Sequence, residues 1–148
     1  MRNMPVTTTL GNQGLYQDAQ VLQTLMHRFI PLKAALTSVA FDGDAFSTTA
    51  KTLIDLSASF GAPDGIQAVY MKIVVNDGGS AGTDTTLILS PINTAGVGLA
   101  FSPMPVDDRA GRYAAIIPCD SNGDIYYQVT ASGAGEFDIV LQIWGYFI

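Results

Sequence analysis

The sequence is poor in the residues from which most catalytic and metal sites are built. It contains one cysteine, Cys119, and one histidine, His27, among 148 residues. A lone cysteine cannot form an intramolecular disulfide, so the chain must fold around an ordinary apolar core, in which we expect Cys119 to be a small buried residue. Triad chemistry needs a positioned base, and nothing ties His27 to Cys119 or to a serine. We therefore expect no enzymatic activity, no cofactor and no metal requirement.

Charge is scarce as well. Charged residues make up 14% of the chain, against about 25% in typical soluble domains, while hydrophobic residues make up 48%. The formal net charge is −6, and the basic residues stand singly rather than in a cluster. We expect no binding to nucleic acid, because a phosphate backbone attracts basic patches. A surface with so few charges favours a subunit that hides part of its area against neighbours.

Long apolar runs are absent too. No run approaches the roughly 18 residues that a membrane-spanning helix needs. The opening residues, MRNMPVTTTL, lack the apolar core and small-residue cleavage site of a secretory signal. We expect no membrane partner, and a soluble protein that is cytosolic or exported by a route other than the general secretory one.

The most informative segment is Glu136–Ile148, which alternates between two faces. One parity is apolar throughout and predicts a strand with one face in the core, namely Phe137, Ile139, Leu141, Ile143 and Phe147. The other parity begins polar but becomes apolar at Val140, Trp144 and Tyr146. A strand that is apolar on its second face predicts contact with a partner surface there.

The N-terminal region differs from the rest. Residues 1–14 show no periodicity and are read as an extended arm or a frayed terminus. Tyr16–Ile30 is the one helix candidate, ended by Pro31, with an apolar stripe at helical spacing formed by Val21, Leu22, Leu25, Met26 and Phe29. The stripe either packs on the chain's own domain or docks on a partner. Val21, Leu25 and Phe29 are its candidate partner-binding residues.

From residue 34 onward the sequence reads as short strands separated by turns. Eight strands are expected, at Ala35–Phe41, Thr49–Phe60, Ile66–Asn76, Thr85–Ser90, Val97–Ser102, Arg112–Pro118, Ile125–Ala131 and Glu136–Ile148. Asp42-Gly43-Asp44 is expected to form the first turn. This pattern predicts a mainly β protein: an antiparallel, jelly-roll-like β-sandwich at 34–148, preceded by an arm and one short helix at 1–33.

Paired aspartates stand in several of the predicted turns, at Asp42/Asp44, Asp107/Asp108 and Asp120/Asp124. A glycosidase would need two carboxyl groups facing each other across a cleft, but turn chemistry selects the same residues. Asp120–Asp124 resembles part of a calcium loop, although its glycine comes at the fourth position and Ala131 stands where a bidentate glutamate belongs. Adventitious calcium binding remains open.

Three aromatic residues fall on the parity opposite the core set of their strand: Tyr126, Trp144 and Tyr146. Such side chains either stack on sugars or are covered by another subunit. The shortage of charge favours a subunit contact. The glycine-rich loop Asp77–Asp84 matches no phosphate-binding motif and is read as a contact loop between two strands.

Taken together, the polar arm, the short helix, the charge-poor Thr/Ser/Ala/Gly-rich β region and the apolar last strand resemble bacteriophage virion proteins. The layout is similar to head decoration (cement) proteins and to β-sandwich modules of tail fibres. The resemblance implies a virion location after assembly in the host cytoplasm, self-association with a trimer favoured, and binding to other shell or tail proteins. The expected function is therefore a structural virion protein that stabilises the particle. The alternative is a tail-fibre module that binds a host receptor or carbohydrate.

Overall fold

The computed structural model describes residues 28–46, 50–77, 85–105, 109–130 and 137–148, with backbone only at 44–46. These residues form eight strands and one short helix. The elements in chain order are β1 (Phe29–Phe46), β2 (Thr52–Ile54), α2 (Leu56–Phe60), β3 (Ala68–Asp77), β4 (Thr86–Ser90), β5 (Leu99–Phe101), β6 (Gly111–Pro118), β7 (Ile125–Thr130) and β8 (Phe137–Phe147). The expected antiparallel β-sandwich is confirmed.

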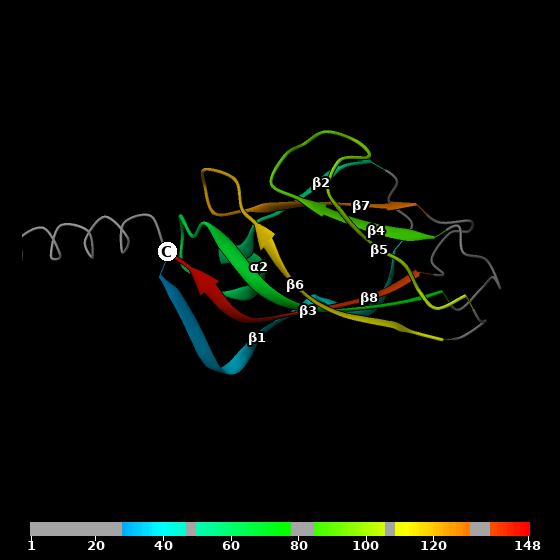
Figure 1. Cartoon of the computed structure of the whole chain (residues 1–148), viewed down its shortest axis with the longest axis horizontal. Coiled ribbons are helices and arrows are strands. Elements are labelled where there is room, and N and C mark those ends of the chain that lie inside the picture. Colours follow the sequence, from blue (N-terminus) through cyan, green and yellow to red (C-terminus); the bar gives the residue numbers. More distant parts are fainter. Residues whose placement is uncertain (1–27, 47–49, 78–84, 106–108, 131–136) are drawn as a thin grey trace, which may run out of the picture.

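The strands form two four-stranded sheets. Sheet A has the order β1-β8-β3-β6 and sheet B the order β2-β7-β4-β5, and all pairs are antiparallel. The chain crosses between the sheets at every connection except β4–β5. This is the jelly-roll-like arrangement expected from the sequence. In Figure 1 the sheets lie as two layers, with β4, β5 and β7 in one and β3, β6 and β8 in the other.

The core lies between the sheets and follows the period-2 pattern of the long strands. In β3 every second side chain from Val69 to Val75 is completely buried, while Tyr70 and Lys72 between them are exposed. Leu87 and Leu89 of β4 and Val129 of β7 face them from sheet B. Since each buried aliphatic side chain contributes about 1.5–3 kcal/mol, this interleaved set drives the folding of the chain.

The predicted strand Thr49–Phe60 is wrong in its second half, where α2 forms. Asp55 is the N-cap and accepts a hydrogen bond from the Ala58 amide at 2.8 Å. Gly61 ends the helix in the left-handed conformation, with φ of 73°. Leu56 and Phe60 are both buried, since residues four apart share one helix face. Leu56 and Phe60 also have the same parity, so their spacing fits a strand as well as a helix. The capping residues Asp55 and Gly61 select the helix.

Two other expectations fail along β1. The end of the predicted helix, Phe29–Ile30, belongs to this strand, and Pro31 continues it at the edge of sheet A, where a missing amide is tolerated. The rest of that predicted helix and the arm lie outside the described residues. Asp42-Gly43-Asp44 is not a turn but a bulge, because Gly43 is skipped between two pairings to β8 and has φ of 117°.

Candidate functional site

A β-bulge in β8 decides which side chains face outward at the end of sheet A. The ladder to β3 pairs Met71 with Ile143 and then Tyr70 with Gly145, so Trp144 is an extra residue without a partner on β3. One extra residue exchanges the two faces of the strand beyond it. The predicted alternation of the last strand therefore holds as far as Trp144, which is exposed as expected, and is wrong at Tyr146 and Phe147.

The consequences fall on the two residues that follow. Tyr146 is paired with the buried Val69 and packs against the core. Phe147 is paired with Ala68 and lines a depression on the outer face of sheet A instead of entering the core. Trp144 and Tyr146 share one parity in the sequence, but the bulge places them on opposite faces of the sheet.

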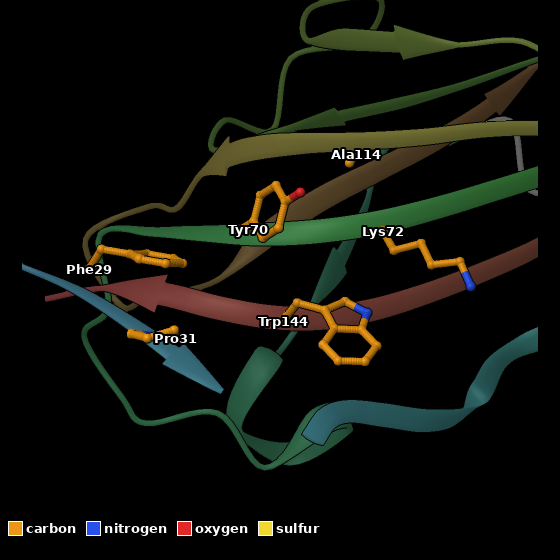
Figure 2. A pocket seen from close by; sticks show the side chains of 6 residues that line it. All are labelled: Phe29, Pro31, Tyr70, Lys72, Ala114 and Trp144. Atoms are coloured by element: carbon orange, nitrogen blue, oxygen red, sulfur yellow. The ribbon is translucent and has the colours of Figure 1, made fainter. Parts of the chain in front are cut away.

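Trp144 helps to form a groove on that outer face. The groove has a volume of about 440 Å³ and is lined by Phe29, Pro31, Tyr70, Lys72, Ala114 and Trp144. These residues come from all four strands of sheet A. We call this set the aromatic groove. Figure 2 shows Tyr70 and Trp144 along its course, with Phe29 towards one end and Lys72 towards the other.

The groove continues into a second depression of about 250 Å³, lined by Phe29, Tyr70, Ile116 and Phe147. The exposed fractions are 41% for Phe29, 38% for Tyr70, 52% for Ile116 and 40% for Trp144. Single exposed apolar residues are ordinary, but a contiguous group of this kind marks interaction surfaces. The apolar area therefore suits contact with another surface.

Phe29 is held in the groove by the absence of a side chain at Gly145. A Cβ atom placed on Gly145 would lie almost on top of the Phe29 ring, so the ring occupies the space that a larger residue would fill. The ring also packs on Phe147, at a centroid distance of 4.9 Å, and edge-on to Tyr70 at 6.4 Å. The aromatic cluster is thus built into the end of the sheet.

Among the residues that the structure describes, Lys72 is the only charged one that lines the groove. Its side chain is exposed and makes no hydrogen bond or ion pair with any residue that the structure describes. On the outer face its neighbours across the ladders are Gln142 and Ala114, neither of which is charged. The groove therefore offers an apolar floor with one ammonium group that has no partner within the described ranges.

The outer face of sheet B is different, because the chain itself covers part of it. The β4–β5 connection folds back, and the Gly96 amide donates to Gln128 Oε1 of β7 at 2.7 Å. Lys51 Nζ donates to the Val97 carbonyl at 2.9 Å. Tyr126 lies on this face opposite Leu53 and is half-buried. Among the described residues, the aromatic groove has no comparable cover.

Val140 is half-buried and pairs with Val74, two residues beyond Lys72 along β3. The next pair on that face, Asp138 with Asn76, is polar. Val140 therefore lies between the groove and the polar end of sheet A, and it lines neither depression. Val21, Leu25 and His27 lie outside the described residues.

Three aspartates, Asp55, Asp120 and Asp124, order the backbone around them. Asp120 Oδ1 accepts the amides of Asn122 and Asp124, at 2.8 and 3.0 Å, which closes a turn. Asp124 Oδ1 accepts the Leu56 amide at 2.9 Å and so anchors α2 to the β6–β7 loop. The Ala58 amide and the Ser57 hydroxyl lower the pKa of the Asp55 carboxyl. Within the described ranges no three metal-ligating side chains come together.

Cys119 packs partly against the core and is a free thiol. Its burial, together with the negative charges of Asp120 and Asp124, raises its pKa to about 12. The thiolate is the reactive form of cysteine, so this side chain behaves as a small apolar residue at neutral pH. The expected apolar character fits this position, but the side chain is half-buried rather than fully buried.

Sequence reasoning identified Trp144 and Phe29 but missed Tyr70, Ala114 and Ile116. A signal for Tyr70 was present, because it falls on the outward parity of β3 with Lys72. Ala114 and Ile116 can be assigned to the groove region only once β6 is known to pair with β3.

No known protein family matches the chain, and no curated protein matches it. None of the helices in the described ranges has the length and apolar character needed to cross a membrane.

Proposed function

We propose that this protein is a structural subunit that self-associates through the aromatic groove and stabilises a virion shell or tail assembly. The observation that carries the proposal is the gathering of Phe29, Tyr70, Ile116 and Trp144 on an outer sheet face. The low charge content and the net charge of −6 support association with protein rather than with nucleic acid. The resemblance of the sequence to virion proteins supplies the setting.

The size of the groove indicates how much of an interface it can provide. Aromatic side chains bury about 200 Å² each when fully covered, so three aromatic rings with about 40% of that area still exposed, together with the smaller Ile116, offer roughly 300 Å². At about 25 cal/mol per Å² this corresponds to about 7–8 kcal/mol. Association costs roughly 4–15 kcal/mol in lost freedom, so the groove needs additional contacts from its partner.

Light scattering coupled to size-exclusion chromatography tests the self-association of the full chain over a range of concentrations. We expect an oligomer, with a trimer favoured, and a shift to monomer when Tyr70→Ser and Trp144→Ser are combined. Leu53→Ser with Ile92→Ser is the matched control, because these residues are 47% and 46% exposed elsewhere. A monomeric wild type at high concentration contradicts the proposal.

Mass spectrometry of purified particles tests the virion setting. We expect the chain to co-purify with the particle, and deletion of residues 1–14 to lower its attachment. Absence of the chain from intact particles would remove the virion part of the proposal and leave self-association standing.

A receptor- or carbohydrate-binding module is the second candidate, favoured by the same grouping of Tyr70 and Trp144 along one groove. Aromatic faces stack on sugars, but recognition also needs several hydrogen-bonding groups. The lining offers the Lys72 ammonium, the Tyr70 hydroxyl and the Trp144 indole N–H, without a carboxylate or an amide side chain. Binding to a glycan array that Trp144→Ser abolishes would favour this candidate.

A further inference from the structure

We infer that the aromatic groove of one copy receives residues 16–27 of a neighbouring copy, with the Asp18 carboxylate against the Lys72 ammonium. The inference deepens the proposed function by naming the segment that the groove binds. It rests on the place where residues 16–27 join the sheet, on their apolar pattern, and on the charge at one end of the groove.

Residues 16–27 join the sheet beside the groove. Arg28 and Ile148 exchange two backbone hydrogen bonds, each of 3.1 Å, which extend the pairing of β1 with β8 by one residue. Phe29, the next residue, already lines the groove. Residues 16–27 are therefore joined directly to the rim of the binding surface.

A segment joined in this way cannot easily reach the groove of its own chain. The two hydrogen bonds with Ile148 hold Arg28 in the ladder, so the backbone follows the strand direction up to that residue. A reversal requires a turn of about four residues. The four available residues before Arg28 include Leu25 and Met26, so the turn would consume half of the apolar stripe. A neighbouring copy presents the same groove without that cost.

The pattern of the segment suits an apolar groove. At helical spacing Leu22 and Leu25 share one face, with Val21 and Met26 beside them. Residues 16–27 would extend about 18 Å as a helix. Laying an amphipathic helix into an apolar groove is a common mode of protein recognition. It would add the contacts that the groove alone lacks.

The charges match as well. Asp18 is four residues before Leu22, so it continues the same face at the end remote from Phe29. It is the only acidic residue in 16–27. Lys72 is the only charged residue in the described lining of the groove, and it lies two positions along β3 from Tyr70, or about 7 Å. An apolar stripe that ends in one carboxylate thus meets an apolar groove that ends in one ammonium.

Charge exchange in the full chain tests this pairing. Asp18→Lys and Lys72→Asp each place like charges together, and we expect each to weaken association by about fivefold. The chain carrying both substitutions restores the opposite charges, so its association should return close to that of the wild type. Asp64→Lys, which reverses an exposed charge in the loop after α2, is the matched control and should have no effect.

Carbodiimide cross-linking of a mixture of ¹⁴N- and ¹⁵N-labelled chains tests whether the contact joins two copies. We expect an Asp18–Lys72 cross-link whose two peptides carry different labels. Cross-links within uniformly labelled pairs only would place the segment on its own groove and overturn the inference.

The outcomes separate this inference from the proposed function. If the wild type associates and Tyr70→Ser with Trp144→Ser abolishes association, but the charge variants have no effect, the groove binds another surface and this inference fails alone. If the wild type is monomeric, both fail. Circular dichroism of every variant shows whether a loss of association reflects unfolding.

Discussion

At the scale of single residues, Gly145 determines where the Phe29 ring can lie. A methyl group on Gly145 would come within 2.5 Å of the ring atoms, closer than any real contact. We expect Gly145→Ala to displace the ring and to lower the free energy of unfolding by about 1–3 kcal/mol, as overpacking does. Urea denaturation measures this value.

The combined variant Phe29→Ala with Gly145→Ala provides the control. Removing the ring makes room for the methyl group, so the two effects should not be additive. Additive losses in the double-mutant cycle would show that the ring does not lie over Gly145.

Cys119 is the other residue with a distinctive chemical environment. Burial and the neighbouring Asp120 and Asp124 carboxylates raise its pKa to about 12 from an ordinary value of 9.0. We expect iodoacetamide at pH 8 to alkylate the folded protein at least about tenfold more slowly than the protein in urea, because only the thiolate reacts. Equal rates would contradict the buried position.

The same shift gives a pH dependence of stability. Above pH 9 the thiol of the unfolded chain loses its proton while the folded chain still keeps it. The unfolded state then binds fewer protons, so the free energy of unfolding should fall as the pH rises above 9. A Cys119→Ala variant should lack this part of the decline.

At the scale of elements, α2 depends on two aspartates that come from different parts of the chain. Asp55 caps the helix locally, whereas Asp124 holds the Leu56 amide from the β6–β7 loop. Asp124→Ala should cost about 1–2 kcal/mol, because it leaves a partly buried amide without its partner. Asp64→Ala, at an exposed loop position, should change stability by less than about 0.5 kcal/mol. Equal urea midpoints for the two variants would contradict the anchoring role.

The elements also show what sequence periodicity can and cannot predict. Alternation and turn residues together located all eight strands, and the period of two is clearest in β3, from Val69 to Val75. It missed α2, whose buried Leu56 and Phe60 satisfy both periods. It also missed the bulge at Trp144, since an extra residue is visible only against the partner strand.

The candidate site could be predicted only in part for a related reason. Trp144 stands out as an aromatic residue on the second face of the last strand, and Phe29 as a member of the apolar stripe in residues 16–30. Tyr70, Ala114 and Ile116 join them only through the strand order β8-β3-β6, which pairs distant segments. The face occupied by Tyr146 depends on the bulge, so its packing against the core could not be read from alternation.

At the scale of the whole molecule, association through the aromatic groove should couple to stability. An assembly that forms only between folded chains raises the melting temperature as protein concentration increases. We expect this increase in the wild type and expect it to vanish in the Tyr70→Ser, Trp144→Ser variant. Differential scanning calorimetry at several concentrations measures it, and equal slopes for both proteins would contradict a groove-based interface.

The place of β8 between β1 and β3 has a consequence for how the chain folds. Sheet A joins the first described strand to the last, so its pairing must wait until both are present. Sheet B contains the local β4–β5 hairpin, which can form much earlier. Because contacts distant in sequence form slowly, closure of sheet A by β8 is expected to limit the folding rate. Until then β1 and β3 each expose an unpaired edge, and chaperones have their greatest opportunity to act in that interval.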